Sequence, residues 1–159
     1  MSGKGKKENM AFDGANGRYD CIKLENQLCF PLYVCSKEIV RHYKPFLDEI
    51  GLTYTQYITM MALWERGCVN VSQLGECLYL DSGTLTPVLK TLEAKGLVIR
   101  KRSEEDERSV NVEATEPGMA LREQAITIPP RMGACVNLSP EEAAELYRIL
   151  HKIIGHFDK

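Results

Sequence analysis

The stretch "TLTPVLKTLEAKG", Thr84–Gly96, carries the clearest structural signal in this chain. Its leucines and valine recur three and four residues apart, which predicts a helix with one buried face. Gly96 then supplies a C-terminal stop, because glycine readily takes the left-handed conformation that ends helices. The N-terminal cap is either Ser82 or Thr84, and the sequence alone does not decide between them. The apolar face carries Leu85, Val88, Leu89 and Leu92, and the polar face carries Ser82, Thr84, Thr86, Lys90 and Thr91.

The segments on either side of this helix extend the motif. "VSQLGECLYL" predicts a short helix capped by Ser72, and "LDSG" makes a tight connection to the next helix. After the glycine, "LVIRKR" and "SVNVEAT" both alternate and favour strands, and the polar "SEEDER" between them makes a hairpin. Two short helices followed by a β-hairpin describe a winged helix-turn-helix. The predicted fold class is therefore mainly α with a small β-hairpin wing.

Amphipathic helical patterns precede this module. Apolar residues recur at helical spacing over residues 22–43, so one long helix is expected there. Pro31 lies inside that run and removes a backbone donor, so the helix either kinks or begins nearer the proline. "TYTQYITMMALWERG" opens with Thr53 and Gln56 at capping-box spacing and ends at Gly67.

Helical patterns also follow the module. Thr115 is predicted to cap "EPGMALREQA", and "IPP" breaks the chain at Pro129 and Pro130. Ser139 then caps the last helix, with Glu142 closing a capping box. A wide apolar stripe on that helix needs a partner outside the winged module, and dimerisation is its simplest use. The stripe consists of Leu146, Ile149, Leu150, Ile153, Ile154 and Phe157.

These patterns predict the organisation of the whole chain. Residues 1–20 hold four glycines, three lysines and little apolar material, so a mobile tail is expected. Residues 21–159 form a single domain, with the winged helix at about 53–115. The dimerisation helices are expected at about 22–46 and 116–158.

Composition excludes several classes of protein. The chain has 159 residues, 44% of them hydrophobic and 26% charged, with a net charge of -2 and a pI near 6.0. It has no apolar run long enough to cross a bilayer and no hydrophobic signal region, so a cytoplasmic protein is expected. Its six cysteines form no C-x-x-C pair, so neither a metal nor a cofactor is expected, and most thiols are predicted to be packing residues. The sequence contains no standard enzyme constellation.

Four separated motifs, in order, resemble a known family. "LENQLCF", "GLTYTQY", "LYLDSGTLTPVLK" and "RSEEDERSV" are similar to signatures of the MarR family of winged-helix regulators. Within that family they resemble the organic hydroperoxide resistance regulators, the OhrR group. The likeness extends from Leu24 to about Leu121. It implies a homodimer that binds double-stranded, pseudo-palindromic operator DNA as a transcriptional repressor.

The resemblance also implies which residues meet DNA. The recognition helix runs from about Thr84 to Lys95. The side chains on it or just before it that would contact the operator are those of Ser82, Thr84, Thr86 and Lys90. In the wing, Asp106 orients Arg108, which enters the minor groove, where A·T-rich DNA attracts cations. The predicted DNA contacts are Ser82, Thr84, Thr86, Lys90, Arg100, Arg102, Asp106 and Arg108.

Cys29 has two interpretations. Its position in an amphipathic run is consistent with an inert core thiol. The resemblance instead makes it the residue that reacts with organic hydroperoxides, the signal. Tyr43 and Tyr54 would hydrogen-bond to it, the latter from the neighbouring subunit, and Tyr33 would belong to the same apolar pocket. A sulfenic acid formed at Cys29 would condense with a second thiol. Cys135 resembles the resolving cysteine of a two-cysteine subgroup.

The chain departs from the family pattern at two positions, and two alternative functions remain open. Pro31 and Thr55 replace residues that the family pattern has beside the thiol and beside Tyr54. One alternative function is a MarR-type repressor controlled by a phenolic or aromatic ligand. The other is a thiol peroxidase enzyme, for which a recognition helix would have no use.

Overall fold

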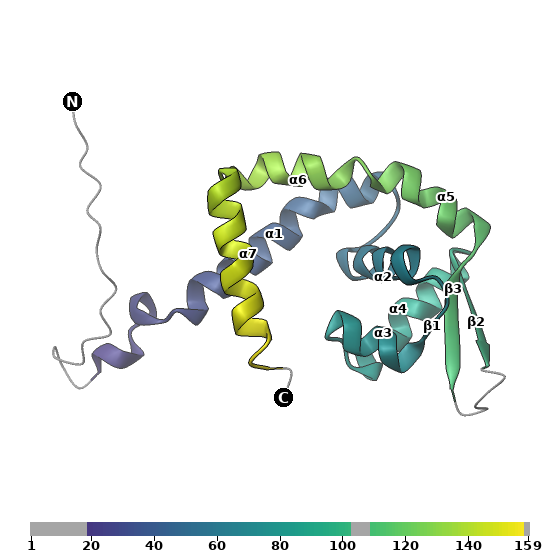
Figure 1. Cartoon of the computed structure of the whole chain (residues 1–159), viewed down its shortest axis with the longest axis horizontal. Coiled ribbons are helices and arrows are strands. Elements are labelled where there is room, and N and C mark those ends of the chain that lie inside the picture. Colours follow the sequence, from purple (N-terminus) through teal and green to yellow (C-terminus); the bar gives the residue numbers. More distant parts are fainter. Residues whose placement is uncertain (1–18, 103–108, 158–159) are drawn as a thin grey trace. The chain divides into compact units, whose positions relative to one another are not determined.

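The computed structural model describes residues 19–102 and 109–157 (Figure 1). These residues divide into two compact units after Glu38. The predicted tail therefore falls outside the described residues, apart from Tyr19 and Asp20. The first unit holds the turns η1 (Asp20–Ile22) and η2 (Leu24–Asn26) and the start of α1 (Cys29–Glu49). The second holds the rest of α1, then α2 (Tyr54–Arg66), β1 (Val69–Asn70), α3 (Val71–Leu78), α4 (Ser82–Ala94), β2 (Val98–Arg102), β3 (Val110–Ala114), α5 (Glu116–Ala125), α6 (Ile128–Val136) and α7 (Pro140–Ile154).

The predicted helix-turn-helix is present as α3 and α4, but its caps differ from those expected. Asp81 is the N-cap of α4, because its carboxylate accepts the backbone N–H of Thr84 at 2.9 Å. Ser82 and Thr84 lie inside the first turn instead. Asn70 caps α3 by accepting the backbone N–H of Ser72 at 2.8 Å, so Ser72 is not that cap. In both cases a carboxylate or amide that precedes the expected cap accepts a free backbone N–H of the first turn.

The predicted hairpin is present, and a third strand joins it. β2 and β3 pair antiparallel with Val98 opposite Ala114 and Arg102 opposite Val110. The two-residue β1 pairs with the other edge of β3, giving the order β1-β3-β2. A strand of two residues is too short for an alternating pattern, so sequence reasoning missed it.

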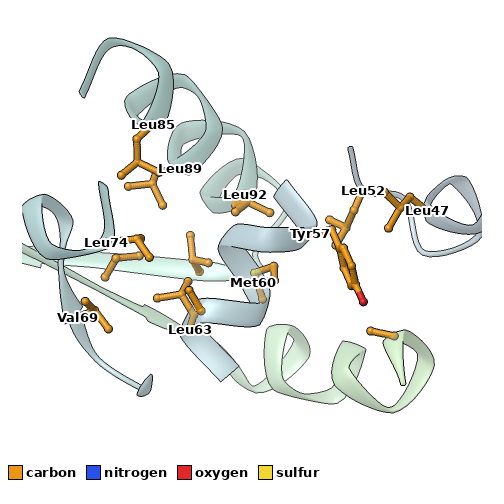
Figure 2. Packing of buried hydrophobic residues seen from close by; sticks show 14 of the residues in the cluster. Leu47, Leu52, Tyr57, Met60, Leu63, Val69, Leu74, Leu85, Leu89 and Leu92 are labelled. Carbon is orange, nitrogen blue, oxygen red and sulfur yellow. The ribbon is translucent and has the colours of Figure 1, made fainter. Parts of the chain in front are cut away.

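The core of the second unit lies between α2, α3, α4 and the sheet. Leu85, Leu89 and Leu92 occupy one face of α4 and point toward Leu74 and Met60 (Figure 2). These five side chains are almost fully buried. The apolar spacing of the recognition helix therefore predicted its buried face correctly, except that Val88 is only half-buried.

Of the two alternatives for the helix at Pro31, a kink or a later start, the structure has the later start. The helix begins at Cys29, so Pro31 lies in the first turn, where no intrahelical partner is lost. The expected helix over 22–43 is thus wrong at both ends: two short turns precede it, and it continues to Glu49. Pro45 lies inside the helix without ending it.

The C-terminal region contains one more helix than expected. Thr115 caps α5 and Ser139 caps α7 with a capping box, as predicted. Between them, Pro129 and Pro130 lie in the first turn of α6 rather than breaking the chain, because a helix tolerates proline before its backbone donors are needed. No residue of α7 is fully buried. In its apolar stripe Leu146 and Ile149 are exposed, whereas Leu150, Ile153 and Ile154 are half-buried.

Two further features concern the chain as a whole. No helix among the described residues has the length and apolar character that a membrane span needs. The prediction that most thiols are packing residues is wrong for the single chain: Cys77 is half-buried and the other five are exposed.

Candidate nucleic-acid interface and reactive thiols

Polar side chains lie on the exposed surface of α4. Ser82, Thr84 and Lys90 are exposed, whereas Thr86 is half-buried. The hydroxyl of Thr84 donates to the Asp81 carboxylate at 2.9 Å. Hydrogen bonds from the backbone N–H and hydroxyl of Thr84 hold the pKa of Asp81 below its ordinary value, so this cap stays ionised. Thr84 thus helps to hold the start of the helix in addition to its predicted role.

The basic residues of the wing are not equivalent. Arg100 is half-buried, and its Nε and Nη2 donate to Oε2 of Glu93 on α4, the former at 3.0 Å. Arg102 is exposed at the end of β2. Lys101 pairs with Glu113 across the strands at 2.6 Å. Arg102 is therefore the more available cation, while Arg100 ties the wing to the recognition helix.

Two predicted DNA contacts, Asp106 and Arg108, lie outside the described residues. Their orientation toward each other and toward a minor groove therefore stays a prediction.

Tyr43 and Tyr54 lie together, although they come from different helices. Their ring centroids are 5.0 Å apart, and Tyr57 lies 6.0 Å from Tyr43. Burial, and then Tyr54, raises the pKa of Tyr43, so this hydroxyl remains a protonated donor at neutral pH. The sequence did not identify Tyr57 as a residue of this site. Its spacing of three residues from Tyr54 is the signal that would have added it to the cluster.

Cys29 opens α1 and is exposed, and so is Tyr33 one turn later. Both belong to the first unit, whereas Tyr43 and Tyr54 belong to the second. The four-residue peroxide pocket therefore stays a prediction.

Cys135 lies near the C-terminus of α6 and is exposed. One turn earlier, Arg131 makes two hydrogen bonds of 2.7 Å to the carboxylate of Glu49 on α1. The Arg131 guanidinium also lies 4.1 Å from the ring centroid of Phe46. These contacts connect the helix that carries Cys135 to the C-terminal part of α1. Within residues 19–102 and 109–157, no three His, Cys, Asp or Glu side chains are grouped to hold a metal ion.

The fold and this surface define the class: a winged helix-turn-helix whose second helix exposes hydroxyl and basic side chains is a DNA-binding transcriptional regulator. The chain belongs to the MarR-type winged-helix regulators, and residues 41–124 match the family described as transcriptional regulator SarA/Rot. The family assignment made from the motifs, and the choice of a regulator over an enzyme, are thus confirmed.

Two relatives in sequence support this assignment. The chain is 50% identical to the organic hydroperoxide resistance transcriptional regulator of Bacillus subtilis, over 83% of this chain and 88% of that protein. It is 43% identical to the HTH-type transcriptional regulator SarZ of Staphylococcus aureus strain NCTC 8325, over 85% and 92%.

Solved structures agree with these relatives. Overoxidized AbfR bound to DNA aligns with a TM-score of 0.71 and 31% identity, over 89% of this chain and 99% of that one. Reduced AbfR bound to DNA aligns with a TM-score of 0.70 and 32% identity, over 86% of this chain and 94% of that one. A mutant of MarR from E. coli, complexed with operator DNA, aligns with a TM-score of 0.75 and 25% identity, over 86% of this chain and 98% of that one.

Proposed function

We propose that this protein is a transcriptional repressor that leaves its operator when an organic hydroperoxide oxidises Cys29. The observation that carries the proposal is the pairing of Tyr43 with Tyr54. The family resemblance assigns both phenols to one thiol, and their rings lie 5.0 Å apart although they belong to different helices. An exposed thiol at Cys29 supplies the reactive atom.

The reaction needs only the thiol and the peroxide. The Cys29 thiol first loses its proton, and the thiolate attacks the outer oxygen of ROOH. The O–O bond breaks, sulfenic acid forms, and the departing alkoxide takes up a proton to give ROH. The sulfenic acid then condenses with a second thiol, which forms a disulfide and releases water. Cys135 or a small cellular thiol is the proposed second partner.

A homodimer is part of the proposal. The family resemblance places Tyr54 of the neighbouring subunit against Cys29. The thiol site is therefore complete only when two chains associate. The exposed part of the α7 stripe, which includes Leu146 and Ile149, offers an apolar surface for that association.

The same dimer would hold two α4 helices for a pseudo-palindromic operator. Two recognition helices in successive major grooves require half-sites about one helical turn apart. The exposed Ser82, Thr84 and Lys90 lie on the face that would enter the groove. A protein that binds operator DNA in this way would act in the cytoplasm.

Operator binding before and after stoichiometric organic hydroperoxide tests the proposal. We expect wild type to lose affinity on oxidation and Cys29→Ser to bind DNA but not respond, since serine cannot form a sulfenic acid. Mass spectrometry should accompany each titration, because the overoxidized form of the relative AbfR is bound to DNA in its structure. Release of Cys29→Ser by peroxide would overturn the proposal. If wild type did not respond to peroxide and a phenolic compound released Cys29→Ser from the operator, the ligand-controlled repressor would be favoured.

A further inference from the structure

Lys95 joins the end of the recognition helix to the start of α2. It is the C-cap residue of α4. Its Nζ donates to the backbone oxygen of Gly51 at 2.6 Å and to Oε1 of Gln56 at 2.9 Å. Both are charge-assisted hydrogen bonds, which are stronger than bonds between neutral groups. One side chain thus connects two elements separated by about forty residues of sequence.

The Gln56 amide oxygen has a second role. It also accepts the backbone N–H of Thr53 at 3.2 Å, which completes the capping box of α2. The side chain of Gln56 is buried, with the residue only 7% exposed. A buried carbonyl that loses a donor is costly, so movement of the first turn of α2 should also displace Lys95.

Tyr54 belongs to that same first turn. It lies between the cap Thr53 and Gln56, and its ring packs 5.0 Å from that of Tyr43. At the other end of the connection, Glu93 lies two residues before Lys95 and binds Arg100 of the wing. A continuous set of contacts therefore links the tyrosine pair, the end of α4 and the base of the wing.

We propose that Lys95 is the positioning residue that couples the Tyr54 turn to the recognition helix. The proposal rests on the redox function given above, and it names the connection through which that site acts on DNA binding. When Tyr54 moves, the Gln56 oxygen moves with it, and Lys95 carries the displacement to the end of α4. Coupling of this kind is measured as a ratio of affinities.

The first experiment measures operator affinity in the reduced and the oxidised state. Lys95→Met removes the donor and keeps the length of the side chain. We expect the reduced variant to bind the operator with an affinity within about threefold of reduced wild type. Oxidation should lower the operator affinity of wild type about tenfold or more, but that of the variant less than about threefold. Lys95→Arg, which keeps charged donors, should restore most of the response. Lys44→Met is the matched control, because Lys44 pairs with Asp48 on its own helix at 2.6 Å.

A double-mutant cycle makes the test independent of redox chemistry. The operator affinity of reduced protein is measured for Tyr54→Ala, Lys95→Met and the double variant. We expect the effect of Tyr54→Ala to shrink about threefold or more when Lys95 is absent. Lys95→Gln replaces Lys95→Met in both experiments if the latter melts far below wild type.

The outcomes separate the two proposals. If wild type responds to peroxide and Lys95→Met responds equally, the coupling role is overturned. If wild type does not respond, the redox function fails and the cycle alone decides: non-additive effects support Lys95 as the coupling residue, and additive effects overturn it. Equal oxidation rates of Cys29 in wild type and Lys95→Met would place the defect after the chemical step and support the proposal. A slowed rate that accounts for the whole lost response would overturn it.

Discussion

At the scale of single residues, Gly118 shows how closely the elements pack. It lies in α5, where its backbone oxygen accepts the indole N–H of Trp64 at 2.8 Å. A Cβ atom at this position would lie 2.0 Å from the backbone oxygen of Leu97. Backbone cannot move aside as a flexible side chain can, so only glycine fits there.

Gly118→Ala should therefore destabilise the protein by about 1–3 kcal/mol, the usual cost of overpacking. The free energy of unfolding from urea titration measures this. Gly133→Ala is the matched control, because Gly133 lies within helix α6 and a Cβ there meets nothing within 4 Å. That variant should be neutral or more stable by about 0.5–1 kcal/mol. Equal loss in both variants would contradict the close contact with Leu97.

The partly buried phenol of Tyr43 should make the stability of the protein depend on pH. Burial raises the pKa of its phenol above the ordinary 10.0, so the unfolded chain ionises first as pH rises. The contribution of this group to stability is fully present below pH 10 and is lost as pH rises through the pKa of the folded state. Wild type should thus lose more stability than Tyr43→Phe between about pH 9 and pH 11, as followed by urea unfolding. Parallel pH profiles would contradict it.

At the scale of elements, capping and predicted DNA contact belong to different residues at the start of α4. Asp81 holds the first turn through the backbone N–H and hydroxyl of Thr84. Ser82 follows it, is exposed, and has no capping role. Two neighbouring polar residues therefore have different functions, which their types alone do not distinguish.

Asp81→Ala should lower the free energy of unfolding by about 1 kcal/mol, because a backbone donor loses its partner. Ser82→Ala should leave stability within about 0.5 kcal/mol, as for most surface changes, and should weaken operator binding if the predicted contact exists. Thermal melting and operator titration of both variants measure the two effects. A larger stability loss for Ser82→Ala would mean that the cap is assigned to the wrong residue.

At the scale of the whole molecule, α7 has little support in a single chain. None of its residues is buried, and Leu146 and Ile149 are exposed by 42% and 40%. Its own hydrogen bonds and its capping box stabilise the helix only locally. An exposed apolar stripe of this kind is typical of a surface that a partner covers.

Replacing Leu146 and Ile149 together by lysine should therefore shift the protein from dimer to monomer or cause aggregation. The reason is that a charged side chain buried in an apolar interface loses its hydration. Light scattering coupled to size-exclusion chromatography measures the mass. Lys152→Ala on the same helix is the control and should leave the mass unchanged. A folded dimer with both lysines in place would exclude α7 from the interface.

Local chemistry was sufficient to predict much of this protein. The spacing of Leu85, Leu89 and Leu92 identified the buried face of the recognition helix, and the capping boxes at Thr53 and Ser139 marked where two helices begin. These features depend on residues within one or two turns of each other, so the sequence contains their full cause. The motifs likewise led to the family.

Only the tertiary structure decided features that depend on residues far apart in the chain. β1 exists because β3 pairs with it, Arg100 is engaged because Glu93 of another element lies beside it, and Lys95 meets Gln56 across 39 positions of sequence. No local pattern encodes such contacts, since each is set by how the elements pack. Residue type and spacing therefore determined the elements and the class of protein, whereas packing determined which charged side chains hold the structure and which remain available to bind DNA.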